Sequence, residues 1–172
     1  NGESGRHVHN IQAMTSVILR HLVEMTDKYR LSESDILMIS TASALHDIGK
    51  ISIDEKILNK PGKLTDEEYE IMKTHTTIGA DMLKSLDISD KSSIIGIAYD
   101  ICRWHHERYD GKGYPDGLKG DEIPISAQVV ALADVYDALT SKRCYKNALP
   151  HIQAITMIKN GECGVFNPLL MQ

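Results

Sequence analysis

Apolar residues recur at intervals of three and four along most of the chain, and this period restricts the possible folds more than any other feature. Such spacing places apolar side chains on one face of a helix. Alternation of the kind that marks strands is nearly absent. The pattern predicts an all-α fold, with helices over residues 17–25, 36–45, 65–86, 92–106, 127–139 and 150–160.

Two of these helices carry capping signals at their start. Ser32 precedes Asp35 and Thr65 precedes Glu68 by three residues, so a hydroxyl and a carboxylate can each bond a free backbone N–H at the helix start. We expect helices to begin directly after Ser32 and Thr65. The second of them should continue unbroken to about Leu86.

The composition fits a single domain over residues 1–172. With 25% charged and 42% hydrophobic residues, the chain does not belong to the disordered or collagen-like classes, and no repeat or linker divides it. Three cysteines without a CxxC pair argue against a disulfide framework and a cysteine zinc site, and favour a reducing cytoplasm. The net charge of -5 opposes binding to duplex nucleic acid, which depends on Lys and Arg.

No apolar run reaches the roughly 18 residues that a membrane span needs, so we expect none in this chain. The first residue is Asn1 rather than Met. We therefore expect a piece of a longer signalling protein with an upstream sensory or regulatory domain. This piece should be cytoplasmic, as the cytosolic part if that protein is anchored in a membrane.

Two long breaks interrupt the helical period. Residues 51–63 contain a Pro-Gly pair, and residues 109–124 (YDGKGYPDGLKGDEIP) hold four glycines and two prolines. Loops of this length inside a compact domain are usually functional. The glycine-rich loop is either a structural hairpin or the border of a binding site, and it matches neither a dinucleotide fingerprint nor a Walker motif.

Histidines and carboxylates gather beside helix ends and these breaks. Imidazoles and carboxylates without thiolates suit iron, manganese or zinc, and suit calcium poorly. We expect His9, His21 and His151 to be surface or core residues with no ligand role. The residues that could coordinate a cation are Glu3, His7, His46, Asp47, His75, His105, His106 and Asp134.

Five motifs, in this order, resemble the HD-GYP family of bacterial cyclic di-GMP phosphodiesterases over essentially the whole chain. They are HDIGK (residues 46–50), ILNKPGKLTDEE, HTTIGA, HHERYDGKGYPDGLKGDEIP and ALADVYDALTSKRCYK. The resemblance implies an HD-domain helical bundle with a long glycine-rich loop that carries the Gly-Tyr-Pro triplet. It also implies pairing into a homodimer through upstream helices.

Position by position, the resemblance implies that all eight residues named above bind metal. Asp47 would bridge two divalent transition metals, iron or manganese first, with zinc, nickel or cobalt in some preparations, and Glu3 would allow a third. Lys50 would lie beside the scissile phosphate and act in catalysis with Asp47. The residues that would contact the cyclic di-GMP substrate are Gly113, Tyr114, Arg143 and Lys146.

The charges of this set agree with the implied chemistry. Three carboxylates contribute a formal -3, whereas two or three divalent cations contribute +4 or +6, so the occupied site would attract a phosphodiester. A hydroxide that bridges the metals could attack phosphorus at neutral pH, because coordination lowers the pKa of water. Lys50 could stabilise or protonate the departing sugar oxygen.

Single residues leave other interpretations open. Lys50 alone could be a solvated lysine at a helix end, and Arg143 with Lys146 could be a charge set near a helix C-terminus. For the whole domain we expect hydrolysis of cyclic di-GMP to pGpG or on to GMP. The alternatives are hydrolysis of another nucleotide by the same site, and a catalytically silent module that senses cyclic di-GMP or docks onto proteins.

Three features depart from the usual family pattern. The segment GVFNP (residues 164–168) lacks a histidine and has Asn167 in place of an aspartate, and Asn10 stands where an arginine is common. None of these positions is implied as a metal ligand. We therefore expect an active site with altered surroundings and altered domain contacts.

Overall fold

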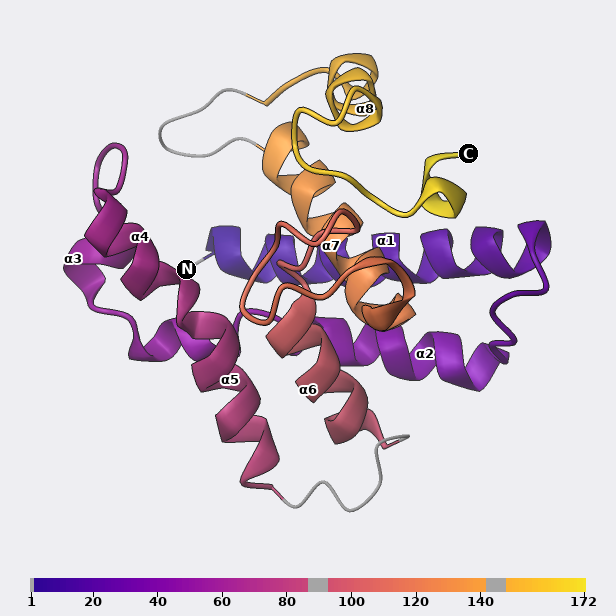
Figure 1. Cartoon of the computed structure of the whole chain (residues 1–172), viewed down its shortest axis with the longest axis horizontal. Helices are drawn as coiled ribbons and strands as arrows, with labels where there is room; N and C mark the ends of the chain where they lie inside the picture. Colours follow the sequence, from indigo (N-terminus) through magenta and orange to yellow (C-terminus); the bar gives the residue numbers. More distant parts are fainter. Residues whose placement is uncertain (1, 87–92, 142–147) are drawn as a thin grey trace.

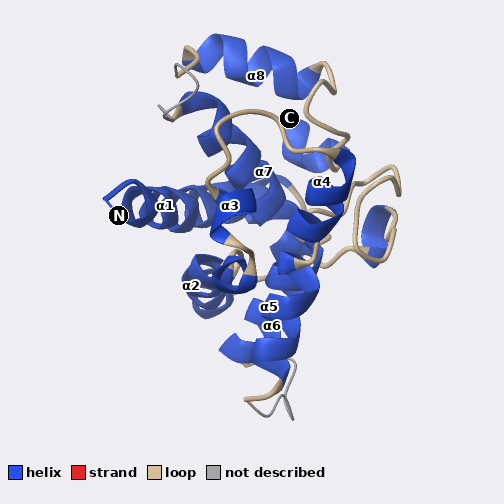
Figure 2. Cartoon of the chain, turned by 90° about the vertical axis from the view of Figure 1, so that its left-hand side faces the viewer, coloured by secondary structure: helices blue, strands red, loops and turns tan. Residues whose placement is uncertain are grey.

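The computed structural model describes residues 2–86, 93–141 and 148–172, and their side chains from residue 5 onward. Within these ranges the chain is helical and has no strand (Figure 2), so the predicted all-α class is confirmed. The elements are α1 (Gly2–Met25), α2 (Glu33–Ala42), η1 (Ser43–Leu45), η2 (Ile48–Ser52), α3 (Glu55–Leu58), α4 (Asp66–Lys73), α5 (His75–Lys84), α6 (Ile94–Trp104), η3 (Gly120–Glu122), α7 (Ile125–Thr140), α8 (His151–Lys159) and η4 (Pro168–Met171).

The core forms where α1, α2, α6 and α7 meet. Helix α7 crosses α1 and is buried along most of its length, while α5 and α6 lie side by side (Figure 1). A smaller apolar cluster holds α8 against the second half of α7. Fully or almost fully buried side chains of the main core are Ile11, Leu19, Ile36, Ile39, Ala98, Ile101, Val129, Val130 and Ala133.

Both predicted capping boxes are confirmed. The Ser32 hydroxyl accepts from the Asp35 backbone N–H, and the Thr65 hydroxyl accepts from that of Glu68. In return the carboxylates of Asp35 and Glu68 accept from the backbone N–H of Ser32 and Thr65, at 2.8 and 2.7 Å. Caps of this kind stabilise a helix by about 1 kcal/mol each.

The prediction of one continuous helix from Thr65 to Leu86 is wrong, because the chain turns at Thr74 and forms α4 and α5 instead. Nδ1 of His75 lies 2.7 Å from the Met72 carbonyl oxygen and bonds it. The Thr74 hydroxyl bonds the Ile71 carbonyl at 2.7 Å. His75 is therefore the first residue of α5 and does not lie within one long helix.

Two glycines let η2, α5 and α6 approach one another closely. A Cβ atom on Gly49 would lie 2.0 Å from the carbonyl oxygen of His75, and one on Gly79 would lie 2.4 Å from Sγ of Cys102. Such distances leave no room for any other residue. The close approach places the segment that carries His46 and Asp47 beside the first turn of α5 and the end of α6.

The two predicted breaks are mostly irregular, with short helices inside them. Residues 51–63 include α3, which the sequence pattern did not indicate, and the glycine-rich loop ends in η3. No pair of strands forms over residues 109–124, so the structural hairpin is excluded. None of the helices in the described ranges combines the length and apolar character that crossing a bilayer requires.

Candidate metal centre

Asp47 lies at the centre of a group of imidazoles that come from four segments of the chain. It follows η1, where the helical segment ends and the chain turns into η2. Its Oδ2 lies 3.3 Å from Nε2 of His46, and its Oδ1 lies 3.4 Å from Nε2 of His75 and 3.8 Å from Nε2 of His105. Two donor groups result, and Asp47 belongs to both: Asp47 with His75, His105 and His106, and Asp47 with His7 and His46.

Backbone carbonyls fix the tautomer of the buried imidazoles. Nδ1 of His46 lies 2.8 Å from the Ser43 carbonyl oxygen, and Nδ1 of His105 lies 3.0 Å from that of Ile101. Nδ1 of His75 lies 2.7 Å from the Met72 carbonyl oxygen. A carbonyl oxygen only accepts, so each Nδ1 carries the proton and donates it. Each Nε2 therefore presents a lone pair toward Asp47.

The imidazole Nε2 atoms and a carboxylate oxygen that face one another here are buried hydrogen-bond acceptors without a donor among the described residues. Among the described residues, no donor reaches Nε2 of His46, His75 or His105, or Oδ1 of Asp47. Unpaired buried polar atoms are costly, and acceptors that face one another repel. Ligands of one transition metal, each at about 2.0–2.2 Å, lie roughly 3 Å apart. The residues present therefore fit divalent cations.

Burial sets the protonation states in the direction that coordination needs. It lowers the pKa of His75 and His105, and together with the nearby His75 it lowers the pKa of His106 to about 3. His46 is the exception, since the Asp47 carboxylate raises its pKa against the effect of burial. The same contact holds the pKa of Asp47 far below its usual range although burial opposes this, so a carboxylate anion is present.

His7 joins the cluster from α1 and is oriented by a carboxylate on α7. Its Nδ1 lies 2.7 Å from Oδ2 of Asp137, and its Nε2 lies 3.6 Å from Oδ1 of Asp134. Asp137 is 3% exposed and also accepts from Nδ2 of Asn10 at 2.7 Å. Metal-binding histidines are commonly held in this way. Asn10, one of the departures from the family pattern, thus bonds the carboxylate that orients His7.

Other predicted site residues lie at the edge of this group or outside the described part. Nζ of Lys50 lies 2.6 Å from Oδ2 of Asp47, on the solvent side of the centre. Arg143 and Lys146 fall outside the described residues, and the side chain of Glu3 is likewise not described. Their predicted roles stay predictions.

The glycine-rich loop folds back onto the end of α6. Oε1 of Glu107 accepts from the backbone N–H of Asp116 at 2.7 Å and of Gly117 at 3.0 Å. A Cβ on Gly113 would lie 2.4 Å from Cα of Glu107, so only glycine allows the loop to pass there. The structure therefore gives Gly113 a packing role, and its predicted contact with substrate stays a prediction.

This path brings Tyr114 beside the imidazoles. Its ring stacks on that of His106, with centroids 4.9 Å apart and planes at 23°. Burial raises the pKa of the Tyr114 hydroxyl further above neutral, so this group is a hydrogen-bond donor. The glycine-rich loop therefore borders the candidate metal centre. This agrees with the second interpretation of its sequence, in which the loop forms the border of a binding site.

Sequence reasoning assigned no role to several residues that hold the site together. Asp137 lies three residues after Asp134 on a predicted helix, so helical spacing alone places both on one face. Glu107 directly follows the paired histidines, a position that gave no signal of burial. Tyr69 and Lys73 lie four residues apart on α4, again a detectable pair.

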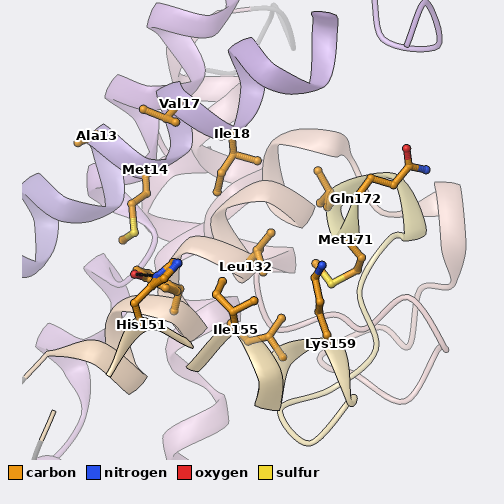
Figure 3. A pocket seen from close by; sticks show the side chains of 13 residues that line it. Ala13, Met14, Val17, Ile18, Leu132, His151, Ile155, Lys159, Met171 and Gln172 are labelled. Atoms are coloured by element: carbon orange, nitrogen blue, oxygen red, sulfur yellow. Dashed lines mark hydrogen bonds between the residues drawn. The ribbon is translucent and has the colours of Figure 1, made fainter. Parts of the chain in front are cut away.

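An apolar groove of about 600 Å³ lies apart from this centre, between α1, α7, α8 and η4 (Figure 3). Its lining includes Met14 and Val17 of α1, Ile155 of α8 and Met171 of η4. None of its lining residues belongs to the metal centre. Because the lining is mostly apolar, the groove offers a phosphodiester little to bind. The histidine cluster, not this groove, is the candidate for phosphate chemistry.

Asn167, the other substituted position, lies away from the metal centre. The residue is 2% exposed, and its side-chain amide donates to Oε1 of Gln128 at 2.9 Å and to the Tyr29 hydroxyl at 3.0 Å. It ties the C-terminal segment to α7 and to the connection between α1 and α2. The departure at this position therefore bears on packing rather than on the ligands.

Comparison with known proteins places this arrangement in a family. A probable cyclic di-GMP phosphodiesterase of Vibrio cholerae is 42% identical over 173 residues, which cover 98% of this chain and 39% of the relative. A 3'3'-cGAMP-specific phosphodiesterase of the same species is 44% identical over 145 residues, covering 84% of this chain and 26% of the relative. The chain thus spans well under half the length of either protein.

A solved structure shares the fold. It is that of Bd1817, a HDG"Y"P protein from Bdellovibrio bacteriovorus, which matches with a TM-score of 0.70 at 20% identity and covers 96% of this chain and 49% of that one. The family model for the HD domain matches residues 6–164, which include every described member of the histidine and aspartate cluster. The chain therefore belongs to the HD domain family.

Proposed function

We propose that this domain is a metal-dependent phosphodiesterase that hydrolyses cyclic di-GMP to linear pGpG or on to GMP, in bacterial second-messenger signalling. One observation carries the proposal: the buried Nε2 atoms of His46, His75 and His105 converge on Asp47 with their lone pairs, and among the described residues no donor satisfies them. A module that only docks onto proteins has no use for such a costly arrangement.

The ligand set favours two divalent cations held by Asp47 in common. His46 and His7 would hold one and His75, His105 and His106 the other, with Asp134 beside His7. Nitrogen and carboxylate donors without thiolate suit iron or manganese. Glu3 would add a third site. When bound, such cations supply Lewis-acid stabilisation of a phosphodiester and lower the pKa of water enough to provide a nucleophile at neutral pH.

The chain's own groups divide the remaining tasks. The Lys50 ammonium, 2.6 Å from Asp47, lies where it can bond a phosphate oxygen or give a proton to the departing sugar oxygen. The Tyr114 ring borders the same centre and can stack on a guanine base. Arg143 and Lys146 are proposed as further phosphate contacts, Arg143 with its planar fork as the stronger.

The substrate is chosen by similarity. Names of relatives support cyclic di-GMP first, and the relative named for 3'3'-cGAMP supports that nucleotide as the second candidate. Both contain two phosphodiester links in one ring, so the metal centre suits either. Discrimination must come from groups that contact the bases.

The test is to incubate manganese- or iron-loaded protein separately with cyclic di-GMP and 3'3'-cGAMP and to separate the products. We expect pGpG or GMP from cyclic di-GMP at a higher rate than cleavage of 3'3'-cGAMP. Asp47→Ala should lose bound metal and activity together, whereas Asp121→Ala, which removes an exposed ion pair with Lys28, should keep both. Binding without turnover in protein whose metal content is confirmed would instead support a sensing module.

A further inference from the structure

Two side chains of α4 contact the Tyr114 ring and have no role in the chemistry described so far. Tyr69 and Lys73 lie four residues apart, hence on one face of the helix. The Thr65 capping box starts α4, and the turn at Thr74 ends it, so Lys73 is its last residue and His75 opens the next helix. The face of α4 that carries Tyr69 and Lys73 thus ends two residues before His75, a candidate ligand of the metal centre.

Tyr114 is held between α4 and the end of α6. Its ring stacks on His106, while the Tyr69 ring meets it edge-on, with centroids 6.5 Å apart and planes at 82°. Nζ of Lys73 lies 5.6 Å from the Tyr114 centroid and 5.5 Å from that of Tyr69. One ammonium therefore contacts both tyrosine rings.

Burial shows which contact of Lys73 matters. Its ammonium also pairs with Oε1 of Glu70 at 2.6 Å, but the Glu70 side chain is 69% exposed whereas that of Lys73 is 26% exposed. An ion pair with so exposed a partner contributes little. A cation over aromatic faces gains strength as water is excluded. The contacts of the Lys73 ammonium with the two tyrosine rings therefore contribute more than its ion pair with Glu70.

We propose that Lys73 is a positioning residue that fixes the Tyr114 ring for contact with the nucleotide, with Tyr69 as its partner. The inference rests on the proposed function and adds a determinant of substrate affinity to it. Lys73 acts on binding rather than on the chemical step, because its contacts are with the tyrosines and not with Asp47 or the histidines. Without the cation, Tyr114 has lost one of the groups that orient it before substrate arrives.

The test compares three variants of the manganese-loaded protein. Lys73→Met removes the charge and keeps the stem, Lys73→Arg keeps a cation that also packs on aromatic faces, and Glu70→Gln is the matched control, since it removes the ion pair and leaves the lysine. Steady-state kcat and KM are measured with cyclic di-GMP and with bis(p-nitrophenyl) phosphate, a phosphodiester without a nucleobase ring system.

For Lys73→Met we expect KM for cyclic di-GMP to rise about five- to thirtyfold, equivalent to about 1–2 kcal/mol, with kcat changed less than threefold. The rise should be smaller with bis(p-nitrophenyl) phosphate. Lys73→Arg should recover most of the loss, and Glu70→Gln should stay within twofold of wild type. Metal content per chain should be equal in all of them.

Two kinds of failure are distinguishable. If wild type cleaves bis(p-nitrophenyl) phosphate but leaves cyclic di-GMP intact, the proposed function is wrong and the inference falls with it. If wild type cleaves cyclic di-GMP and Lys73→Met keeps its KM, or loses kcat equally on both substrates, the inference alone is overturned. An effect of Glu70→Gln as large as that of Lys73→Met would also overturn it, because the ion pair would then be the cause.

Discussion

Replacing Gly49 with alanine should disable the metal centre while leaving most of the fold intact. A Cβ at this position would lie 2.0 Å from the carbonyl oxygen of His75 and 2.7 Å from the backbone nitrogen of Gly79. Carbon and oxygen atoms in contact normally lie about 3.3 Å apart. Both obstructing atoms belong to the backbone of α5, so relief requires η2 and α5 to separate by roughly 1 Å.

Separating η2 from α5 would also move Asp47 away from His75. Asp47 precedes Gly49 by two residues, and its Oδ1 lies 3.4 Å from Nε2 of His75. Moved roughly 1 Å further apart, the two atoms could no longer both reach one ion at about 2.1 Å. Overpacking of this kind costs about 1–3 kcal/mol. If this cost falls on the metal-bound state, it predicts a loss of manganese affinity of about 5- to 150-fold.

The assay is calorimetric titration of metal-free protein with manganese, with thermal unfolding followed by circular dichroism in parallel. Gly5→Ala is the matched control, since a Cβ there meets no atom within 4 Å and alanine suits the helix interior. We expect the control to bind manganese as wild type does. Wild-type affinity in Gly49→Ala would refute the argument that this close approach aligns Asp47 with His75.

Two further outcomes can be checked on the same protein. Asp137→Asn should weaken manganese binding about tenfold, because His7 and Asn10 donate to different oxygens of Asp137 and asparagine replaces one of these oxygens with an NH2 group that cannot accept. Titration of the metal-free variant checks this, and equal affinity would contradict it. Cys102 is fully buried, and burial raises the pKa of its thiol to about 12. Iodoacetamide at pH 8 should therefore label it only after urea is added, as read by peptide mass spectrometry; labelling of the native protein would show that the helices around it open.

Local signals in the sequence predicted the helices well where local chemistry decides them. The helix starts at Ser32 and Thr65 follow from a hydroxyl and a carboxylate three residues apart, and both capping boxes are present. The break at Thr74 does not follow from such a signal. At this break the His75 ring bonds the Met72 carbonyl, and α5 packs closely against η2 at Gly49.

The candidate site shows the same division. The types of its residues and their motifs indicated a cation site, yet nothing in their spacing shows that Asp47 faces His75 and His105. Asp137 lies 130 residues from His7 in the chain, and their bond exists because α1 crosses α7. Long-range contacts of this kind come from helix packing. By contrast, helical periodicity alone could have predicted that Asp134 and Asp137 lie on one face of α7.

The bonds from main-chain carbonyls to His46, His75 and His105 have an evolutionary consequence. Peptide carbonyls, rather than neighbouring side chains, orient these three rings. Neighbouring side chains can therefore be substituted without changing the orientation of the imidazoles. Substitutions should be poorly tolerated instead at Gly49 and Gly79, where an added methyl group would displace its neighbours. Substitutions on the surface should therefore leave the geometry of the candidate metal centre unchanged, because the path of the main chain maintains it.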